Sequence, residues 1–326
     1  MNLLYPLKFT PIFKDKVWGG QKIHTGLGLD FSPLSNCGEA WVLSGVPGSQ
    51  TLVSNGFLEG NELNDLVEIY MDDLVGEKAF EQFPDQFPIL VKFIDSNDWL
   101  SIQVHPDDAL AAKRNIGNGK TEMWYILDAE KNAVLISGFS REVNQKVYRD
   151  HLEQKRMKEI LNVEEVQRGD VFFMPGGRVH ALGPGLLLAE IQQTSDTTYR
   201  IYDWDRVDGE GNSRELHTEL ALEAIDFTVH DTYRTTYSRL KNQTVNLVEC
   251  PAFTTNILEL DHGIEKDLEY IDSFIIYLCT EGNCSIQYLH GMEEIKKGEI
   301  VLIPATMDHL FLLPKPKTKL LEIFYQ

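Results

Sequence analysis

A histidine at the end of a punctuated β-rich segment is the first residue of this chain that points to chemistry. His180 closes the run GDVFFMPGGRVH, in which Gly169, Pro175, Gly177 and His180 follow one another at spacings of 6, 2 and 3. The first glycine allows a tight turn into a strand of β-forming residues, and Pro-Gly-Gly then turns the chain into the next strand. A lone histidine on a strand is more often a core residue than a ligand, so its role depends on partners.

Residues suited to be those partners lie upstream. Gln103 and His105 are two residues apart in the apolar run LSIQVHPDD, so on a strand both side chains project from the same face. Glu122 opens a second β-rich run, in KTEMWYIL. Two imidazoles, one carboxylate and one amide oxygen form a mixed N/O ligand set with a charge of about −1, which leaves a divalent ion about one positive charge. Together the residues predict a metal site.

These motifs resemble the cupin β-barrels, in which the late histidine points into the barrel and binds a metal. Longer stretches resemble type I mannose-6-phosphate isomerases of the short bacterial form, namely VKFIDSNDWLSIQVHPDD, GKTEMWYIL, PGGRVHALGPGLLLAEIQQTSDTTYRIYDWDR, PLKFTPIFKDKVWGGQKI and CGEAWVLSG. The resemblance covers residues 4–217, and residues 194–206 are its most specific part. Cys37 departs from the family pattern, which has an aliphatic residue there, away from the expected chemistry.

The resemblance implies a mainly β fold with two cupin (jelly-roll) barrels and helical insertions. It also implies an enzyme that interconverts mannose 6-phosphate and fructose 6-phosphate with one bound zinc ion (Zn2+) per chain. The implied zinc ligands are Gln103, His105, Glu122 and His180. The implied catalytic arginine is Arg200, in SDTTYRIYDWDR.

Such an isomerisation moves a proton between C1 and C2 through an enediol(ate), and its developing oxyanion needs strong stabilisation. A divalent metal supplies this as a Lewis acid. The neutral Gln103 leaves more positive charge on the ion than a second carboxylate would. Arg200 stays charged and donates in a fixed plane, so it is suited to stabilise the enediolate.

The residue that carries the proton stays open among three candidates. Lys120 lies two residues before Glu122, on the same face of an extended segment, where it can bind phosphate or carry protons. Glu190 stands in the apolar run GLLLAEIQQ, so it either faces the pocket or pairs with a buried arginine. Glu39, in GEAW, is the third candidate.

Charge excludes one class of partner and constrains another. The chain has 50 acidic and 30 basic residues, a net charge of −20, which argues against nucleic-acid binding. A sugar phosphate is itself an anion, so local cations must attract it at short range. The predicted sources of that positive charge are the metal, Lys120 and Arg200, with Arg178 or Arg206 in addition.

Hydropathy and cysteine content predict a cytoplasmic protein with no membrane association. No run of about 18 apolar residues occurs, and the first residues lack the pattern of a signal peptide. The four cysteines form no CxxC pair, which favours reduced thiols. The sequence carries no legible signal of oligomeric state.

The elements that must position these residues are mostly strands. Helices are predicted within residues 62–83, 141–161 and 215–225, and a short helix is predicted after His105 with Pro106 at its first position. The domains predicted are a catalytic metal-binding cupin domain over residues 1–230 and a metal-free cupin-like barrel over 231–326. In the latter, Gly298, Pro304 and His309 repeat the first motif loosely but have no upstream ligand pair, so His309 is predicted to be structural.

Two other functions fit the same residues. Two histidines and a carboxylate also describe the facial triad of non-haem iron oxygenases, although Gln103 as a fourth ligand would occupy a position that oxygen and substrate need. The second alternative is a non-catalytic sugar-phosphate-binding cupin that keeps the metal site without turnover. Fold alone does not separate these functions.

Overall fold

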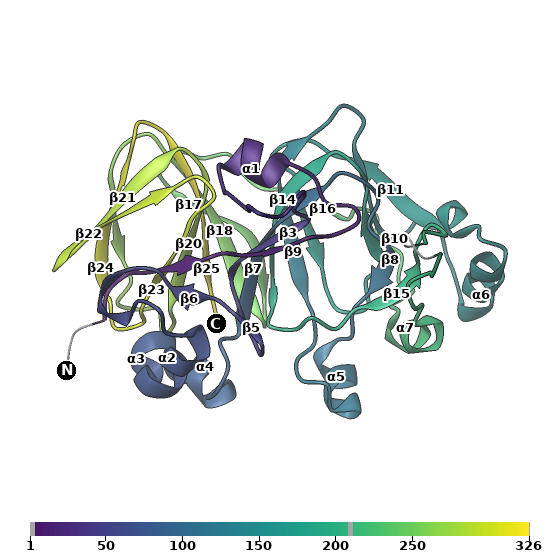
Figure 1. Ribbon diagram of the computed structural model, residues 1–326, viewed down its shortest axis with the longest axis horizontal. Helices are drawn as coiled ribbons and strands as arrows, with labels where there is room; N and C mark the ends of the chain where they lie inside the picture. Colours follow the sequence, from purple (N-terminus) through teal and green to yellow (C-terminus); the bar gives the residue numbers. More distant parts are fainter. Residues whose placement is uncertain (1–3, 208–210, 326) are drawn as a thin grey trace.

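A computed structural model describes residues 4–207 and 211–325 of the chain. It is mainly β, as predicted, with two seven-stranded sheets, a five-stranded, a four-stranded and a two-stranded sheet in the described part. Figure 1 shows two bodies side by side, one formed mainly by the blue-to-teal segments and the other by the yellow-green C-terminal segments.

Two sheets of the N-terminal body carry the predicted site residues. The first, here called the floor sheet, has the strand order β16 (Arg234–Thr235), β12 (Val171–Met174), β9 (Glu122–Ala129), β14 (Leu186–Gln193), β7 (Ile89–Ser96), β3 (Glu39–Leu43) and β2 (Ile12–Lys14). The second, here called the roof sheet, has the order β11 (Leu161–Glu165), β10 (Val134–Phe139), β13 (His180–Leu182), β8 (Ile102–Val104) and β15 (Tyr199–Tyr202).

The floor sheet is buried on both faces, because its strands alternate between two hydrophobic clusters. Val91 and Phe93 of β7 pack in one cluster with Ile276 of the C-terminal body. The intervening Ile94 packs on the opposite face, in a cluster with Leu182 of the roof sheet. Successive side chains of a strand point to opposite faces, so even-numbered β7 residues face the roof sheet.

The C-terminal body also consists of two sheets. Its large sheet has the order β17 (Thr244–Cys250), β18 (Phe253–Leu260), β25 (Thr318–Phe324), β20 (Ile275–Glu281), β23 (Ile300–Ile303), β1 (Leu7–Thr10) and β6 (Leu52–Val53). Its small sheet has the order β19 (Ile264–Asp267), β24 (His309–Pro314), β21 (Asn283–Tyr288) and β22 (Gly291–Lys296). The two-stranded sheet joins β4 (Gly45–Val46) and β5 (Ser49–Gln50).

The beginning of the chain takes part in the C-terminal body. Leu7 of β1 pairs with Leu302 of β23, and the other side of β1 pairs with β6. Figure 1 shows this purple strand lying against the yellow-green body. The division at residue 230 stays a prediction, to which the structure adds two N-terminal strands in the large C-terminal sheet.

Helices are short and lie between strands. They are α1 (Lys22–Leu27), α2 (Leu63–Tyr70), α3 (Asp72–Val75), α4 (Glu77–Gln82), α5 (Asp108–Arg114), α6 (Gln145–Glu153) and α7 (Thr218–Ala224), with 3-10 turns η1 (Gly56–Leu58) and η2 (Met157–Glu159). Residues 62–83 form three helices rather than one, because the chain turns at Met71 and Gly76, whose φ angles are 52° and 87°.

The prediction for Pro106 is wrong. Asp107 is the N-cap of α5, where its side chain accepts a hydrogen bond from the Leu110 N–H, and the helix begins one residue later. Pro106 therefore precedes the helix instead of opening it.

His309, predicted to be structural rather than a metal ligand, lies at the surface. This histidine is 59% exposed at the start of β24, and its Nδ1 lies 3.6 Å from a Glu265 carboxylate oxygen. The four cysteines are free thiols, as predicted. No helix in the described ranges is long and apolar enough to cross a membrane.

Candidate metal centre and substrate cavity

Three predicted site residues lie directly opposite one another on adjacent strands of the roof sheet. Gln103 of β8 pairs with His180 of β13 on one side and with Arg200 of β15 on the other. His105 follows β8 directly, two residues after Gln103. Glu122 begins β9 of the floor sheet, so the predicted ligands come from both sheets.

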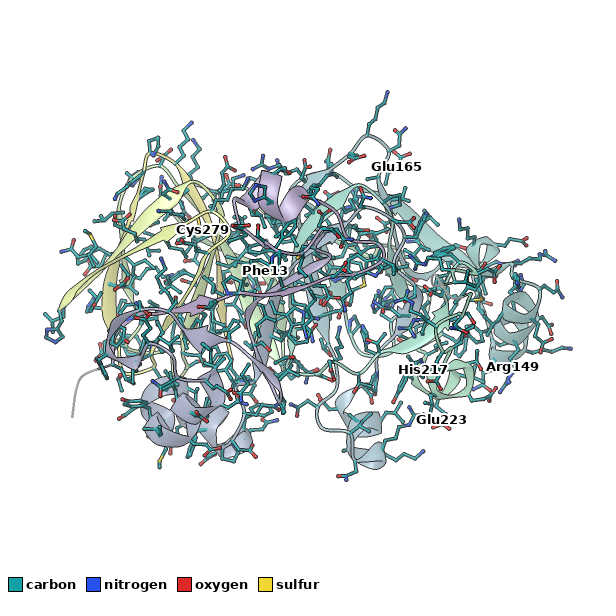
Figure 2. The ribbon with its side chains drawn as sticks, viewed as in Figure 1. Phe13, Arg149, Glu165, His217, Glu223 and Cys279 are labelled. Carbon is teal, nitrogen blue, oxygen red and sulfur yellow. The ribbon has the colours of Figure 1, made fainter. Side chains whose placement is uncertain are left out.

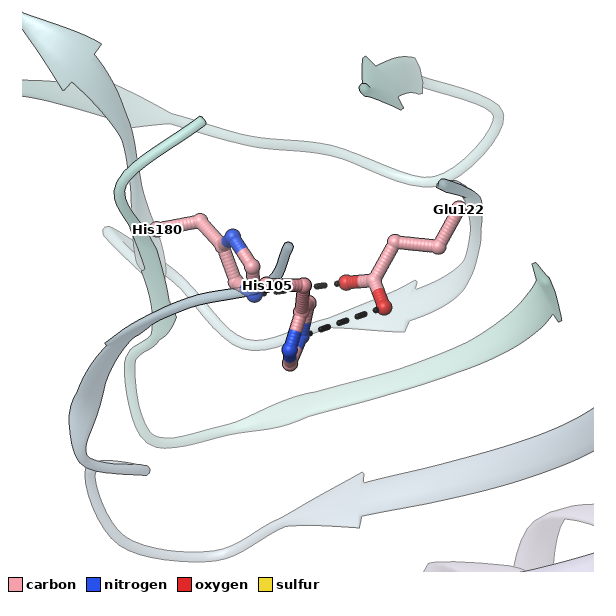
Figure 3. A group of neighbouring side chains, drawn as sticks. All are labelled: His105, Glu122 and His180. Carbon is pink, nitrogen blue, oxygen red and sulfur yellow. Dashed lines mark ion pairs between the residues drawn. The ribbon is translucent and has the colours of Figure 1, made fainter. Parts of the chain in front are cut away.

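His105, Glu122 and His180 form a buried cluster (Figure 3). His105 Nε2 lies 3.4 Å from Glu122 Oε2, and His180 Nε2 lies 3.3 Å from Glu122 Oε1. The ligand atoms of all three residues lie within 4.8 Å of one another. The side chains are at most 2% exposed, so the cluster is closed to bulk water.

The two imidazole rings are held with Nε2 toward the carboxylate. His105 Nδ1 lies 2.9 Å from the Thr197 carbonyl oxygen, and His180 Nδ1 lies 2.8 Å from that of Arg178. A carbonyl accepts the Nδ1–H, which leaves the Nε2 lone pair facing inward, the arrangement found around metal-bound histidines.

The donor set fits a divalent cation. Glu122 Oε1 and His180 Nε2 are buried with no hydrogen-bond partner, although buried polar atoms are nearly always satisfied. Burial, helped by the Lys120 charge, lowers the pKa of His180 to about 4 and that of His105 well below its ordinary value. Both rings are therefore neutral near pH 7, the form that binds a metal.

Lys120 lies beside the cluster, next to Glu122, as predicted from the two-residue spacing that places both on one face of an extended segment. Its Nζ contacts Glu122 Oε2 and lies 3.1 Å from His105 Nε2. Burial and the nearby Glu190 charge raise the pKa of Glu122, against the lowering effect of Lys120. The ammonium group thus balances the carboxylate in a nearly dry environment.

A cavity of about 380 Å³ opens next to the cluster, between the two sheets. Five of the predicted residues line it: Glu39, Gln103, Lys120, Glu190 and Arg200. A cavity of this size falls in the range of small-molecule sites. The predicted proton-transfer residues thus share one cavity.

A row of four side chains crosses the floor of this cavity. Trp41, Lys92, Glu190 and Trp124 lie opposite one another on β3, β7, β14 and β9. Glu190 accepts hydrogen bonds from Lys92 Nζ at 3.0 Å and from Trp124 Nε1 at 2.9 Å. Lys92 also donates to Gln192 Oε1 at 2.6 Å. The partner of Glu190 is thus a buried lysine, not the arginine that the sequence suggested.

Lys92 is the main residue that sequence reasoning missed. Its only signal is a charged residue in the apolar run ILVKFI, at a position that faces the cavity. Burial alone would raise the pKa of Glu190, but Lys92 and then Lys120 lower it to about 2. Such a carboxylate is a weak base at neutral pH, which reduces its suitability as the proton acceptor.

Arg200 is held by hydrogen bonds to the segment that precedes α7. Its Nη1 donates to the Glu215 carbonyl at 2.7 Å, and its backbone N–H donates to His217 Nδ1 at 3.1 Å. Figure 2 shows His217 at the start of α7, close to the edge of the roof sheet. The Arg200 Nε atom is buried without a hydrogen-bond partner, and the side chain lines the cavity.

The other two predicted cations, Arg178 and Arg206, have partners outside the cavity. Arg178 lies over the Tyr233 ring at 4.6 Å, and Arg206 pairs with Asp203 at 2.6 Å. Neither lines the cavity, so the prediction that they contribute local positive charge there is wrong. Arg214, which the sequence did not single out, lines the cavity and pairs with Asp203 at 2.5 Å.

Comparison with known proteins identifies the family. The family model "Phosphomannose isomerase type I, catalytic domain" matches residues 6–151. Mannose-6-phosphate isomerase ManA of Bacillus subtilis is 34% identical over 306 residues, which cover 92% of this chain and 93% of that protein. This chain belongs to the type I mannose-6-phosphate isomerase family. A mannose-6-phosphate isomerase of Streptococcus mutans is 32% identical, with 93% of each chain covered.

Solved structures of family members have the same fold. The crystal structure of the mannose 6-phosphate isomerase from Bacillus subtilis matches with a TM-score of 0.87 and 31% identity, over 98% of this chain and 99% of that one. A phosphomannose isomerase from Salmonella typhimurium, only 16% identical, matches with a TM-score of 0.79 over 98% and 99% of the two chains. At that identity the likeness concerns the fold alone.

Proposed function

We propose that this protein interconverts mannose 6-phosphate and fructose 6-phosphate through an enediol(ate). The observation that carries the proposal is the buried His105, Glu122 and His180 cluster beside a cavity lined by Arg200. Membership of the family supports the same reaction, because the relatives that cover most of this chain are named mannose-6-phosphate isomerases.

Zinc is the proposed metal, held by Gln103, His105, Glu122 and His180. Zinc is redox-inert and accepts nitrogen and oxygen ligands, so it suits a site whose substrate passes through an easily oxidised enediol. When bound, it would supply Lewis-acid stabilisation of the oxygen on C1 or C2. The neutral Gln103 amide keeps more positive charge on the ion than another carboxylate would.

The chain's own residues would orient the substrate and move the proton. Arg200 donates to the enediolate oxygens from a guanidinium that already has an unused N–H. Glu39 and Glu190 are each held in an ion pair with a lysine, at 3.3 and 3.0 Å, and both also accept an indole N–H. Lys120 is also paired, with Glu122, but it lies beside the cluster, 3.1 Å from His105 Nε2, so we assign proton transfer to it. Lys120→Met should abolish exchange of the substrate C2 proton with deuterated water.

The proposed architecture is a pair of cupin (jelly-roll) barrels. The floor and roof sheets would form the catalytic barrel of the domain predicted over residues 1–230, with β16 joining from just beyond that boundary. The two C-terminal sheets would form a metal-free barrel over 231–326, completed by β1 and β6. Four free thiols support a cytoplasmic location.

The test is turnover of mannose 6-phosphate by the purified protein before and after chelation, followed by zinc re-addition. We expect fructose 6-phosphate to form, to stop with the chelator and to return with zinc. Oxygen uptake with iron would favour the oxygenase alternative. Tight sugar-phosphate binding without product would favour the non-catalytic alternative, and either result would contradict the isomerase.

A further inference from the structure

The cations of the cavity differ in whether a carboxylate neutralises them. Four of the six pair with a carboxylate: Lys16 with Glu39, Lys92 with Glu190, Lys120 with Glu122, and Arg214 with Asp203. Among residues 4–207 and 211–325, Lys14 and Arg200 have no carboxylate within 4.0 Å. The cavity therefore has two cations whose charge is free to act on a ligand.

Lys14 is held in place by uncharged groups. Its Nζ donates to Ser49 Oγ at 3.1 Å and lies 3.8 Å from the centre of the Trp41 ring. Burial and the charge of Lys16 lower its pKa, while Glu39 acts in the opposite direction. The ammonium group is thus positioned in the cavity wall, near Lys16 and Lys92. Such a group of positive charges attracts anions.

Lys14 lies far from the metal cluster along the floor sheet. It ends β2, the edge strand, whereas Glu122 begins β9, four strands away in the order β9, β14, β7, β3, β2. At about 4.8 Å per strand the two backbones are roughly 19 Å apart along the sheet, and long side chains span part of that distance. A cavity that extends between them is suited to an elongated ligand with different groups at its two ends.

The proposed substrate has this form. The reacting carbons C1 and C2 are at one end of the hexose and the phosphate, on C6, is at the other. It presents two anionic groups to the protein, the phosphate dianion and the oxyanion that develops during reaction. Arg200 is assigned to the oxyanion, which leaves the second unpaired cation for the phosphate.

We propose that Lys14 binds the phosphate group of the substrate and so sets the preference for phosphorylated over free sugars. Its Nζ would donate charge-assisted hydrogen bonds to phosphate oxygens, with Trp41 beneath it keeping the ammonium group in place. Lys16 does not take this role, because Glu39 neutralises it at 3.3 Å. The inference rests on the proposed isomerase function.

The test is Lys14→Met in the metal-loaded enzyme. We expect KM for mannose 6-phosphate to rise about 10- to 100-fold with kcat changed little, since charge-assisted hydrogen bonds are among the stronger ones. The inhibition constant of inorganic phosphate should rise by a similar factor, while weak inhibition by unphosphorylated mannose stays unchanged. Lys14→Arg, which keeps the charge, should retain most of the affinity and shows that the position tolerates substitution.

Lys131→Met is the matched control, since this exposed lysine lies outside the cavity-lining residues and its replacement removes the same charge. It should leave both constants unchanged. Unchanged KM and phosphate inhibition in Lys14→Met would overturn the proposal, as would an equal loss of affinity for free mannose, which would indicate hydroxyl binding. If the wild-type protein shows no turnover, the isomerase proposal fails, but calorimetry of inorganic phosphate with wild type and Lys14→Met still decides the Lys14 site.

Discussion

Lys92 and Glu190 lie opposite each other on β7 and β14, and their side chains form an ion pair of 3.0 Å that is about 7% exposed. Each charge sits in the wall of the substrate cavity, where neither could remain without the other. Gln192 and Trp124 complete the hydrogen bonding of the pair. The pair therefore places two mutually neutralised charges in the floor of the candidate cavity.

Removing one partner of this pair should cost more than removing both. Lys92→Met leaves the Glu190 carboxylate buried without its cation, so we expect a loss of about 3 to 5 kcal/mol in the free energy of unfolding. The double variant Lys92→Met/Glu190→Leu should recover a large part of that loss. Urea unfolding of the four proteins in the double-mutant cycle measures this, and purely additive losses would contradict it.

His180→Ala should lose metal and activity together. The substitution removes one of the two neutral imidazoles from a cluster that has only one carboxylate. Residues that only orient metal ligands already contribute about 10- to 100-fold to metal affinity. Because His180 is a proposed ligand itself, we expect zinc affinity to fall by more than about 100-fold. Chelator competition measures the affinity. His309→Ala is the control, because that exposed histidine lies on β24, and metal content should not change. Full zinc occupancy in His180→Ala would exclude His180 as a ligand.

Arg200→Ala should retain zinc and lose turnover. Removing a donor from a developing oxyanion typically costs about 100- to 1000-fold in kcat, and we expect a loss of that size. Zinc content, measured on the same sample, separates a catalytic effect from loss of the site. Arg149→Ala serves as the control, since Arg149 pairs with Glu219 on the outside of the molecule (Figure 2). Wild-type turnover in Arg200→Ala would remove this residue from the mechanism.

Local periodicity in the sequence was enough to predict which residues share one face of a strand. Alternation along a strand places Gln103 and His105 on one face, and it also puts Glu190 on the face that lines the cavity. Pairings across the sheets could not be predicted in this way. Lys92 meets Glu190 from a strand 98 positions earlier in the chain.

The same limit applies to long-range partners elsewhere. β1 pairs with β23, which lies almost at the other end of the sequence, and no local sequence pattern predicts this pairing. Arg206 and Arg178 were misassigned because their partners, Asp203 and Tyr233, are decided by tertiary packing. Composition identifies cations, but only the fold shows which of them are neutralised.

Asp203 should make the enzyme sensitive to acid. Burial alone would raise the pKa of this carboxyl, but hydrogen bonds from Arg214 and Arg206 lower it below its ordinary value. A carboxyl with a depressed pKa in the folded state stabilises the protein fully above its unfolded pKa of about 3.9, and this stabilisation is lost as the pH falls through the lower folded value. The unfolded state then binds the proton first, so stability rises with pH across this window.

Asp203→Asn tests this pH dependence directly. At pH 7 the variant should lose roughly 2 to 4 kcal/mol in the free energy of unfolding, because two arginines lose their buried anionic acceptor. Below about pH 4 the difference from wild type should shrink, since the unfolded wild-type chain then takes up a proton at Asp203, which the unfolded variant cannot do. Urea unfolding at pH 7, 5 and 3.5 measures both free energies. At pH 3.5 the unfolded carboxyl is largely protonated, so a difference that stays constant down to that pH would contradict the assigned ion pairs, as would one that grows on acidification. Because Arg214 lines the cavity beside Arg200, the same variant should also raise KM for mannose 6-phosphate at pH 7.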